Sequence, residues 1–244
     1  MEEYQWIEGV LAVEAVLQAQ SREMVGLLIN RDRFDGPVAR LQHLARQTGM
    51  TVSRVPAAVI DEHAPNKSHG GVIARVGPRR MSALADLFVS PAPVIFVLDG
   101  VEDPYNFGQA VRSIYAAGID GLIVPTRSWL SAAATVIRAS AGATEHMPTA
   151  TAATADAVAM AQSRRIPIGV ATTDKARPMG EFDLTGPLLL LIGGEKRGVA
   201  RAVEEVADWR VSIPYGRETG YALGTAAAAA VLSFEVLRQR QAKG

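Results

Sequence analysis

A short apolar run that stops at two consecutive glycines constrains the fold of this chain most. Residues 188–192 are all Leu or Ile, Gly193 and Gly194 end the run, and the charged segment 195–197 and Gly198 follow. Five apolar residues are too few to span a membrane and predict a buried strand. Glycines after a strand permit positive φ and let a ligand approach the backbone. Because open α/β sheets bind ligands at the carboxyl ends of their strands, this loop is a candidate site.

Strands and helices alternate along the rest of the sequence. Helical periodicity is found at residues 7–19, 36–47, 57–63, 109–117, 132–141, 154–164, 199–207 and 226–240. Apolar runs predict strands at residues 24–29, 50–55, 72–76, 94–98, 121–124, 166–171, 188–192 and 209–215. This alternation is typical of parallel β–α units, so the predicted fold class is α/β.

A proline- and arginine-rich stretch at residues 78–92 interrupts this alternation and is typical of a domain boundary. We therefore expect a small α/β domain at residues 1–80, a linker at residues 81–92 and a larger parallel-sheet domain at residues 93–244. The 244 residues are enough for two modest domains.

Composition excludes several classes of protein. Lys and Arg together number 25, as do Asp and Glu, so a nucleic-acid-binding surface would have to be a local basic patch. The absence of Cys excludes disulfides, Cys-ligated zinc and thiol catalysis, and fits a reducing cytosol. The first residues carry no signal-peptide pattern. We expect a cytoplasmic protein with no membrane association and no metal.

The polar loop of residues 99–108 is a second candidate site. It contains Asn106, and the helix expected at residues 109–117 carries Arg112. Arg112 would lie one turn beyond the loop, where its guanidinium could bind a phosphate or carboxylate. The alternative is structural, with Asp103 as the N-cap of the helix and Arg112 paired with it.

Two further polar loops carry candidate residues. Four donors that could contact RNA phosphate or sugar precede two glycines: Asn66, Lys67, Ser68 and His69. The alternative for each of them is an ordinary loop residue. Thr172 begins a polar loop at the expected carboxyl end of the strand 166–171.

Three segments, in this order, resemble the motifs of the SpoU (TrmH-like) RNA 2′-O-ribose methyltransferases of the SPOUT superfamily. They are residues 98–108 with Arg112, residues 191–198, and residues 211–215 before an alanine-rich C-terminal helix. Residues 7–77, including the Ser-His-Gly-Gly segment at 68–71, resemble more weakly the ribosomal-protein-like substrate-binding domain of that family.

The resemblance implies a trefoil-knotted C-terminal domain, an exception to the rule against knots. It also implies a homodimer that binds S-adenosyl-L-methionine and methylates a ribose 2′-hydroxyl of rRNA or tRNA. The implied catalytic residues are Asn106, Arg112 and Glu195. Expected cofactor contacts are Thr172, Gly193, Gly198, Ile213 and Leu223, and expected RNA contacts are Asn66, Lys67, His69 and Arg112. The Gly-x-Gly-x-x-Gly motif of Rossmann-type methyltransferases is absent after the first strand.

The third motif departs from the family pattern. The family normally has Ser-Leu-Asn where this chain has Ala222-Leu223-Gly224, and the nearest hydroxyl is that of Thr225. Two other functions therefore stay open. The protein could bind RNA or the cofactor without catalysis, or it could methylate a base atom.

Overall fold

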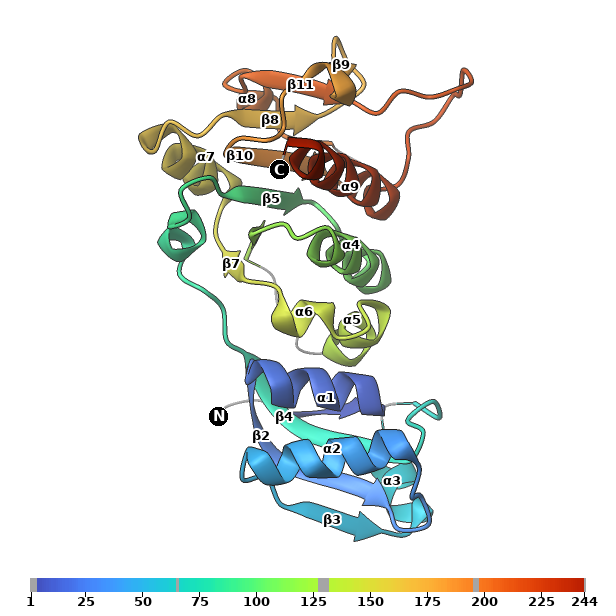
Figure 1. Ribbon diagram of the computed structural model, residues 1–244. Helices are drawn as coiled ribbons and strands as arrows, with labels where there is room; N and C mark the ends of the chain where they lie inside the picture. Colours follow the sequence, from blue (N-terminus) through green and yellow to red (C-terminus); the bar gives the residue numbers. More distant parts are fainter. Residues whose placement is uncertain (1–3, 65, 127–131, 195–197, 244) are drawn as a thin grey trace. The chain divides into compact units, whose positions relative to one another are not determined.

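The computed structural model describes residues 4–64, 66–126, 132–194 and 198–243, and it divides the chain into two compact units. The first unit contains Met1–Arg80 and Ser128–His146, and the second contains Met81–Arg127 and Met147–Gly244. The first unit thus takes up a segment from the middle of the chain, which the sequence did not predict. Figure 1 shows the elements of both units.

The first unit is built on a four-stranded sheet with the order β1-β4-β2-β3. Its strands are β1 (Gln5–Glu8), β2 (Arg22–Asn30), β3 (Val52–Val55) and β4 (Val72–Arg79). Strand β4 is antiparallel to β1 and β2, whereas β2 and β3 are parallel. The helices of this unit are α1 (Val10–Ala19), α2 (Gly36–Gln47), α3 (Ala57–His63), α5 (Ala133–Ala139) and α6 (Ala143–His146).

The beginning of this unit corrects one prediction. The helix expected from residue 7 begins only at Val10, because Ile7 pairs with Ala74 of β4 and the N–H of Gly9 donates to the carbonyl of Val72. Ile7 fits the apolar stripe of a helix and the buried face of a strand equally well. Its pairing with a distant strand decides between them.

Buried polar contacts hold the segment of α5 and α6 in the first unit. The carboxylate of Glu145 is fully buried and accepts hydrogen bonds from Arg22 (2.9 Å) and from the hydroxyl of Ser21. Arg138 donates to the buried carboxylate of Glu8 over 3.0 Å. Removing one partner of a fully buried pair such as Arg22–Glu145 costs about 3–5 kcal/mol, so this pair favours the observed packing of the segment.

The second unit contains a seven-stranded parallel sheet with the order β7-β6-β5-β10-β8-β11-β9. Its strands are β5 (Val94–Asp99), β6 (Gly121–Val124), β7 (Thr149–Thr151), β8 (Ile168–Ala171), β9 (Arg177–Pro178), β10 (Leu188–Gly193) and β11 (Trp209–Ser212). The sequence predicted neither β7 nor β9. The central strands β5 and β10 are buried along almost their whole length, as continuous apolar runs predict.

Helices cover this sheet. Apolar side chains of the short helix η1 (Leu84–Phe88) and of α7 (Thr154–Ser163) belong to one buried cluster. Alternate residues of β5 and β10 contribute to the same cluster. Helices α4 (Pro104–Ala116) and α9 (Thr225–Lys243) pack against each other, and α9 contacts β10. The remaining helical segments are η3 (Met179–Glu181) and α8 (Arg201–Glu204).

The strand order positions the site. Strands β5, β10, β8 and β11 are neighbours although they come from distant parts of the sequence, and all are parallel. The loops that follow them therefore leave the same edge of the sheet. The observed sheet confirms the predicted α/β class, whereas the trefoil knot stays a prediction.

Candidate active site

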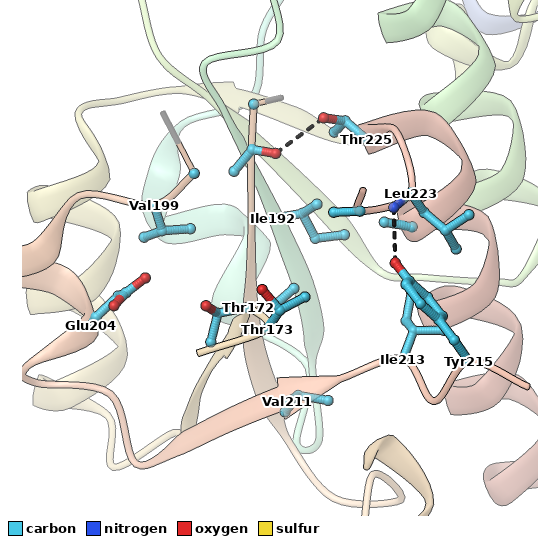
Figure 2. A pocket seen from close by; sticks show the side chains of 16 residues that line it. Thr172, Thr173, Ile192, Val199, Glu204, Val211, Ile213, Tyr215, Leu223 and Thr225 are labelled. Atoms are coloured by element: carbon cyan, nitrogen blue, oxygen red, sulfur yellow. Dashed lines mark hydrogen bonds between the residues drawn. The ribbon is translucent and has the colours of Figure 1, made fainter. Parts of the chain in front are cut away.

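A pocket lies at the carboxyl ends of β8, β10 and β11 (Figure 2). All five residues expected to contact the cofactor line it: Thr172, Gly193, Gly198, Ile213 and Leu223. They belong to four separate segments of the chain, which meet only because the sheet places their strands side by side. The pocket therefore has the position that ligand sites take in open parallel sheets.

The two glycines at the end of β10, Gly193 and Gly194, are required by the chain's own backbone. A Cβ atom on Gly193 would lie 2.1 Å from the carbonyl carbon of Gly198, and one on Gly194 would lie 2.2 Å from the carbonyl oxygen of Gly100. The N–H of Gly198 donates to the carbonyl of Gly194 over 2.9 Å, which closes the loop. Glu195, the catalytic candidate inside this loop, lies outside the described residues.

Hydrogen bonds fix the segment of the altered third motif. The N–H of Leu223 donates to the hydroxyl of Tyr215 (2.8 Å), and the hydroxyl of Thr225 donates to the carbonyl of Gly193 (3.1 Å; Figure 2). Thr225 is buried and is the first residue of α9. Its side chain thus joins the third motif to the end of β10, next to the triplet that lacks the family's serine and asparagine.

Among the lining residues that were not expected to contact the cofactor are three polar ones that the sequence did not single out: Thr173, Glu204 and Tyr215. The carboxylate of Glu204, at the end of α8, faces the pocket opposite Thr172 in Figure 2. In the sequence Glu204 is one of several acidic residues between 204 and 208, and nothing there distinguishes it. Its neighbour Glu205 instead pairs with Arg201 at the surface.

Asn106 lines a second pocket, formed by the loop of residues 100–104, Asn106 and Thr225. Thr225 also lines the first pocket, so the two sites adjoin through its side chain. The N–H of Asn106 donates to the carboxylate of Asp103 (2.7 Å), which makes Asp103 the N-cap of α4. The expected N-cap at Asp103 is therefore confirmed, whereas its expected pairing with Arg112 is not among these contacts.

The position of Arg112 corrects another expectation. Helix α4 begins at Pro104 rather than at residue 109, because proline is favoured at the first helical position and Asp103 caps it. Arg112 is eight residues beyond Pro104, about 12 Å along the helix axis. It is exposed and lines neither pocket.

The loop that contains the expected RNA contacts is fixed by internal hydrogen bonds. Asn66 donates to Glu8 from its backbone N–H (3.0 Å) and its side chain (3.3 Å), and Ser68 donates to the same carboxylate. His69 accepts from the N–H of Gly71 at Nδ1, so its Nε2 carries the proton and donates to Asp61. Lys67 is exposed.

The described residues contain no cluster of three or more metal-ligating side chains. Within the same residues, no helix is long and apolar enough to cross a membrane.

Comparison with known proteins gives two family matches. Residues 93–234 match the SpoU rRNA methylase family, and residues 6–82 match the RNA 2′-O ribose methyltransferase substrate-binding family. The first match covers more than half of the chain. The chain belongs to the SpoU rRNA methylase family. This membership confirms the predicted family and the prediction that the protein is an RNA methyltransferase. It does not support the alternative that the protein binds RNA or the cofactor without catalysis.

Individual relatives of this SpoU methylase cover nearly its whole length. The 23S rRNA (guanosine-2′-O-)-methyltransferase RlmB of Photobacterium profundum is 30% identical over 96% of this chain and 98% of its own. A crystal structure of an RNA 2′-O ribose methyltransferase covers 98% of this chain and 90% of its own, with 26% identity and a TM-score of 0.83. The SpoU methyltransferase AviRb from Streptomyces viridochromogenes, in complex with the cofactor AdoMet, covers 97% and 90%, with 25% identity and a TM-score of 0.80.

Proposed function

We propose that this protein transfers the methyl group of S-adenosylmethionine to a ribose 2′-hydroxyl of ribosomal RNA. The observation that carries the proposal is the single pocket in which Thr172, Gly193, Gly198, Ile213 and Leu223 meet, in a member of the SpoU family. The name of the Photobacterium relative supports a guanosine of 23S rRNA as the target. A ribosomal RNA substrate is in keeping with the predicted cytoplasmic location.

The residues of the first pocket fit S-adenosylmethionine. Ile213 and Leu223 offer an apolar surface to the adenine ring, and Thr172 offers a hydroxyl. The carboxylate of Glu204 would attract the positively charged groups of the cofactor, because opposite charges interact strongly where the pocket reduces solvent. When bound, the cofactor supplies an electrophilic methyl group on sulfur.

The protein's task is to hold the ribose 2′-oxygen in line with that methyl carbon, at about 3–3.5 Å. Transfer would join the 2′-oxygen to the methyl carbon as the carbon–sulfur bond breaks, with its electron pair left on sulfur and the hydroxyl proton passed to water. We assign the positioning of the ribose to the pocket of Asn106, because it adjoins the cofactor pocket through Thr225. Glu195 is the remaining catalytic candidate.

We assign Arg112 to the RNA rather than to proton transfer. A guanidinium is a poor base but a good two-pronged ligand for phosphate. The exposed position of Arg112 on α4 leaves it accessible to a large substrate. The loop of Asn66, Lys67 and His69 in the first unit is proposed as a second RNA contact.

Methyl transfer is tested with methyl-labelled S-adenosylmethionine and unmodified 23S rRNA transcribed in vitro. We expect label in 2′-O-methylguanosine after digestion to nucleosides. Absence of label in the RNA, or label on a base atom, would overturn the proposal.

Arg112→Ala is the matched variant for this assay. We expect it to abolish transfer but to leave cofactor affinity, measured by calorimetry, within about twofold of the wild type, because Arg112 is outside the pocket. Arg112→Lys should also fail, since a point charge does not reproduce a bidentate contact. A normal rate in Arg112→Ala would refute the assignment of this residue alone.

A further inference from the structure

Phe34, in the loop between β2 and α2, is the most exposed large hydrophobic side chain among the described residues. It is 80% exposed, although aromatic rings normally contribute large buried areas to cores and interfaces. The residue that follows it, Asp35, is the N-cap of α2, so the loop has a defined end.

An arginine covers one face of this ring. The guanidinium carbon of Arg54 lies 4.6 Å from the ring centroid of Phe34. The same guanidinium donates from Nη2 to the carbonyl of Arg31 (3.0 Å) and to that of Arg33 (2.6 Å). Arg54 is therefore held by the backbone on either side of the turn. Because Phe34 is so exposed, its other face is open to solvent.

The pair lies at the edge of the sheet that carries the loop of expected RNA contacts. Phe34 follows β2 and Arg54 is in β3, two parallel strands whose carboxyl ends meet at one edge. The N–H of Asn30 donates to the carbonyl of Gly71 (2.8 Å), and Arg33 donates to the carbonyl of Gly70. The end of the loop 66–71 therefore lies beside the turn that carries Phe34.

Two of the three arginines around Phe34 are near carboxylates, whereas Arg54 donates to backbone carbonyls and leaves one net positive charge beside the ring. Arg33 pairs with Asp35, and Arg31 lies 3.9 Å from Asp32. The hydrogen bond from Arg33 and the N–H of Val38 hold the pKa of Asp35 below its usual value, so this carboxylate is ionised at neutral pH. A ligand with a flat, apolar face and a negative charge nearby therefore suits this ring.

We propose that the open face of Phe34 stacks an unpaired base of the RNA substrate, with Arg54 supporting the opposite face. The inference rests on the proposed function in one respect, namely that the substrate is RNA. Unpaired bases stack on aromatic side chains in sequence-tolerant RNA recognition. A single exposed ring is too small a surface for a stable protein interface.

The test measures binding of a fluorescein-labelled oligouridylate of about twelve nucleotides to the full chain by fluorescence anisotropy. Phe34→Leu should weaken binding about tenfold, the loss of one stacked base, whereas Phe34→Tyr should stay within about twofold of the wild type. The salt dependence of the affinity should be the same in the wild type, Phe34→Leu and Phe34→Tyr, because neither substitution removes a phosphate contact.

A second arginine–aromatic pair provides the control variant. Arg75 lies over the ring of Tyr4 at 5.7 Å. Tyr4 precedes β1, and the first residue of β1, Gln5, pairs with Val76, which lies toward the end of β4 that is distant from Gly71. Tyr4→Leu should bind the oligonucleotide as the wild type does. Equal losses in Tyr4→Leu and Phe34→Leu would overturn the inference.

Phe34→Trp tests stacking directly. Addition of the oligonucleotide should quench the tryptophan fluorescence of this variant more than that of the wild type. Wild-type affinity in Phe34→Leu, or no added quenching in Phe34→Trp, would overturn the inference. Neither measurement needs catalysis. Failure of methyl transfer by the wild type would therefore refute the proposed function and leave the stacking result to be judged separately.

Discussion

Gly193 and Gly194 lie where backbone segments from β5, β10 and the loop ending at Gly198 come together. The sequence suggested that these glycines let a ligand approach the backbone. The distances to Gly198 and Gly100 show that the space a Cβ would need is already occupied by the chain itself. The glycines therefore shape the pocket indirectly, by allowing its walls to pack closely.

Gly193→Ala tests this close packing. We expect a loss of about 1–3 kcal/mol in the free energy of unfolding, because backbone atoms of Gly198 cannot move aside as a flexible side chain would. Affinity for S-adenosylmethionine, measured by calorimetry, should fall at least about tenfold. Gly180→Ala is the control, since a Cβ there meets nothing within 4 Å. Similar behaviour of the two variants would contradict the explanation.

At the scale of single elements, the start of α4 combines structure and function in one loop. Asp103 caps the helix through the N–H of Asn106, and both residues line the second pocket. An early helix start also carries Arg112 away from the loop. The local rule of N-capping thus decides that Asn106 lies beside the pockets and that Arg112 lies outside both of them.

Asp103→Ala should lower the free energy of unfolding by about 1 kcal/mol, because the N–H of Asn106 loses its acceptor. Asp103→Asn should retain the stability, since asparagine is an equally good N-cap. Denaturant unfolding of both variants measures this difference. An equal loss in both would show that the carboxylate charge, rather than the cap, stabilises the helix.

At the scale of the whole molecule, the helices α4 and α9 present aromatic side chains to solvent. Tyr105 and Tyr115 of α4 are 56% and 42% exposed, and Phe234 of α9 is 47% exposed. The two helices pack against each other, so these rings belong to one helical layer. We propose that this layer forms the interface of the homodimer that the family resemblance implies.

Light scattering should therefore report about twice the chain mass of 25.9 kDa at micromolar concentration. Phe234→Glu should shift the protein toward the monomer, because a buried unpaired charge at an interface is costly. Leu11→Glu, at an exposed residue of α1, should not change the mass. A wild type that scatters as a single chain would refute the dimer.

The sequence by itself determined the central strands and the edge of the sheet at which the candidate pocket lies. Continuous apolar runs such as β5 and β10 are local features, since they must be buried on both faces wherever they lie. Residues that follow parallel strands reach the same edge of a sheet, so Thr172 and Gly193 could be grouped without coordinates. Ile213 was expected there only from the family resemblance, because the predicted strand ran on to residue 215.

Only the tertiary structure decided the features that depend on a distant partner. Ile7 became a strand residue through β4, and the first unit took up α5 through contacts such as Arg138 with Glu8, 130 positions apart. Glu204 lines the pocket because α8 is placed between β10 and β11 in the chain. The local sequence does not distinguish Glu204 from its neighbour Glu205. Pairing and packing between remote segments set these positions, and a local pattern of residues does not contain that information.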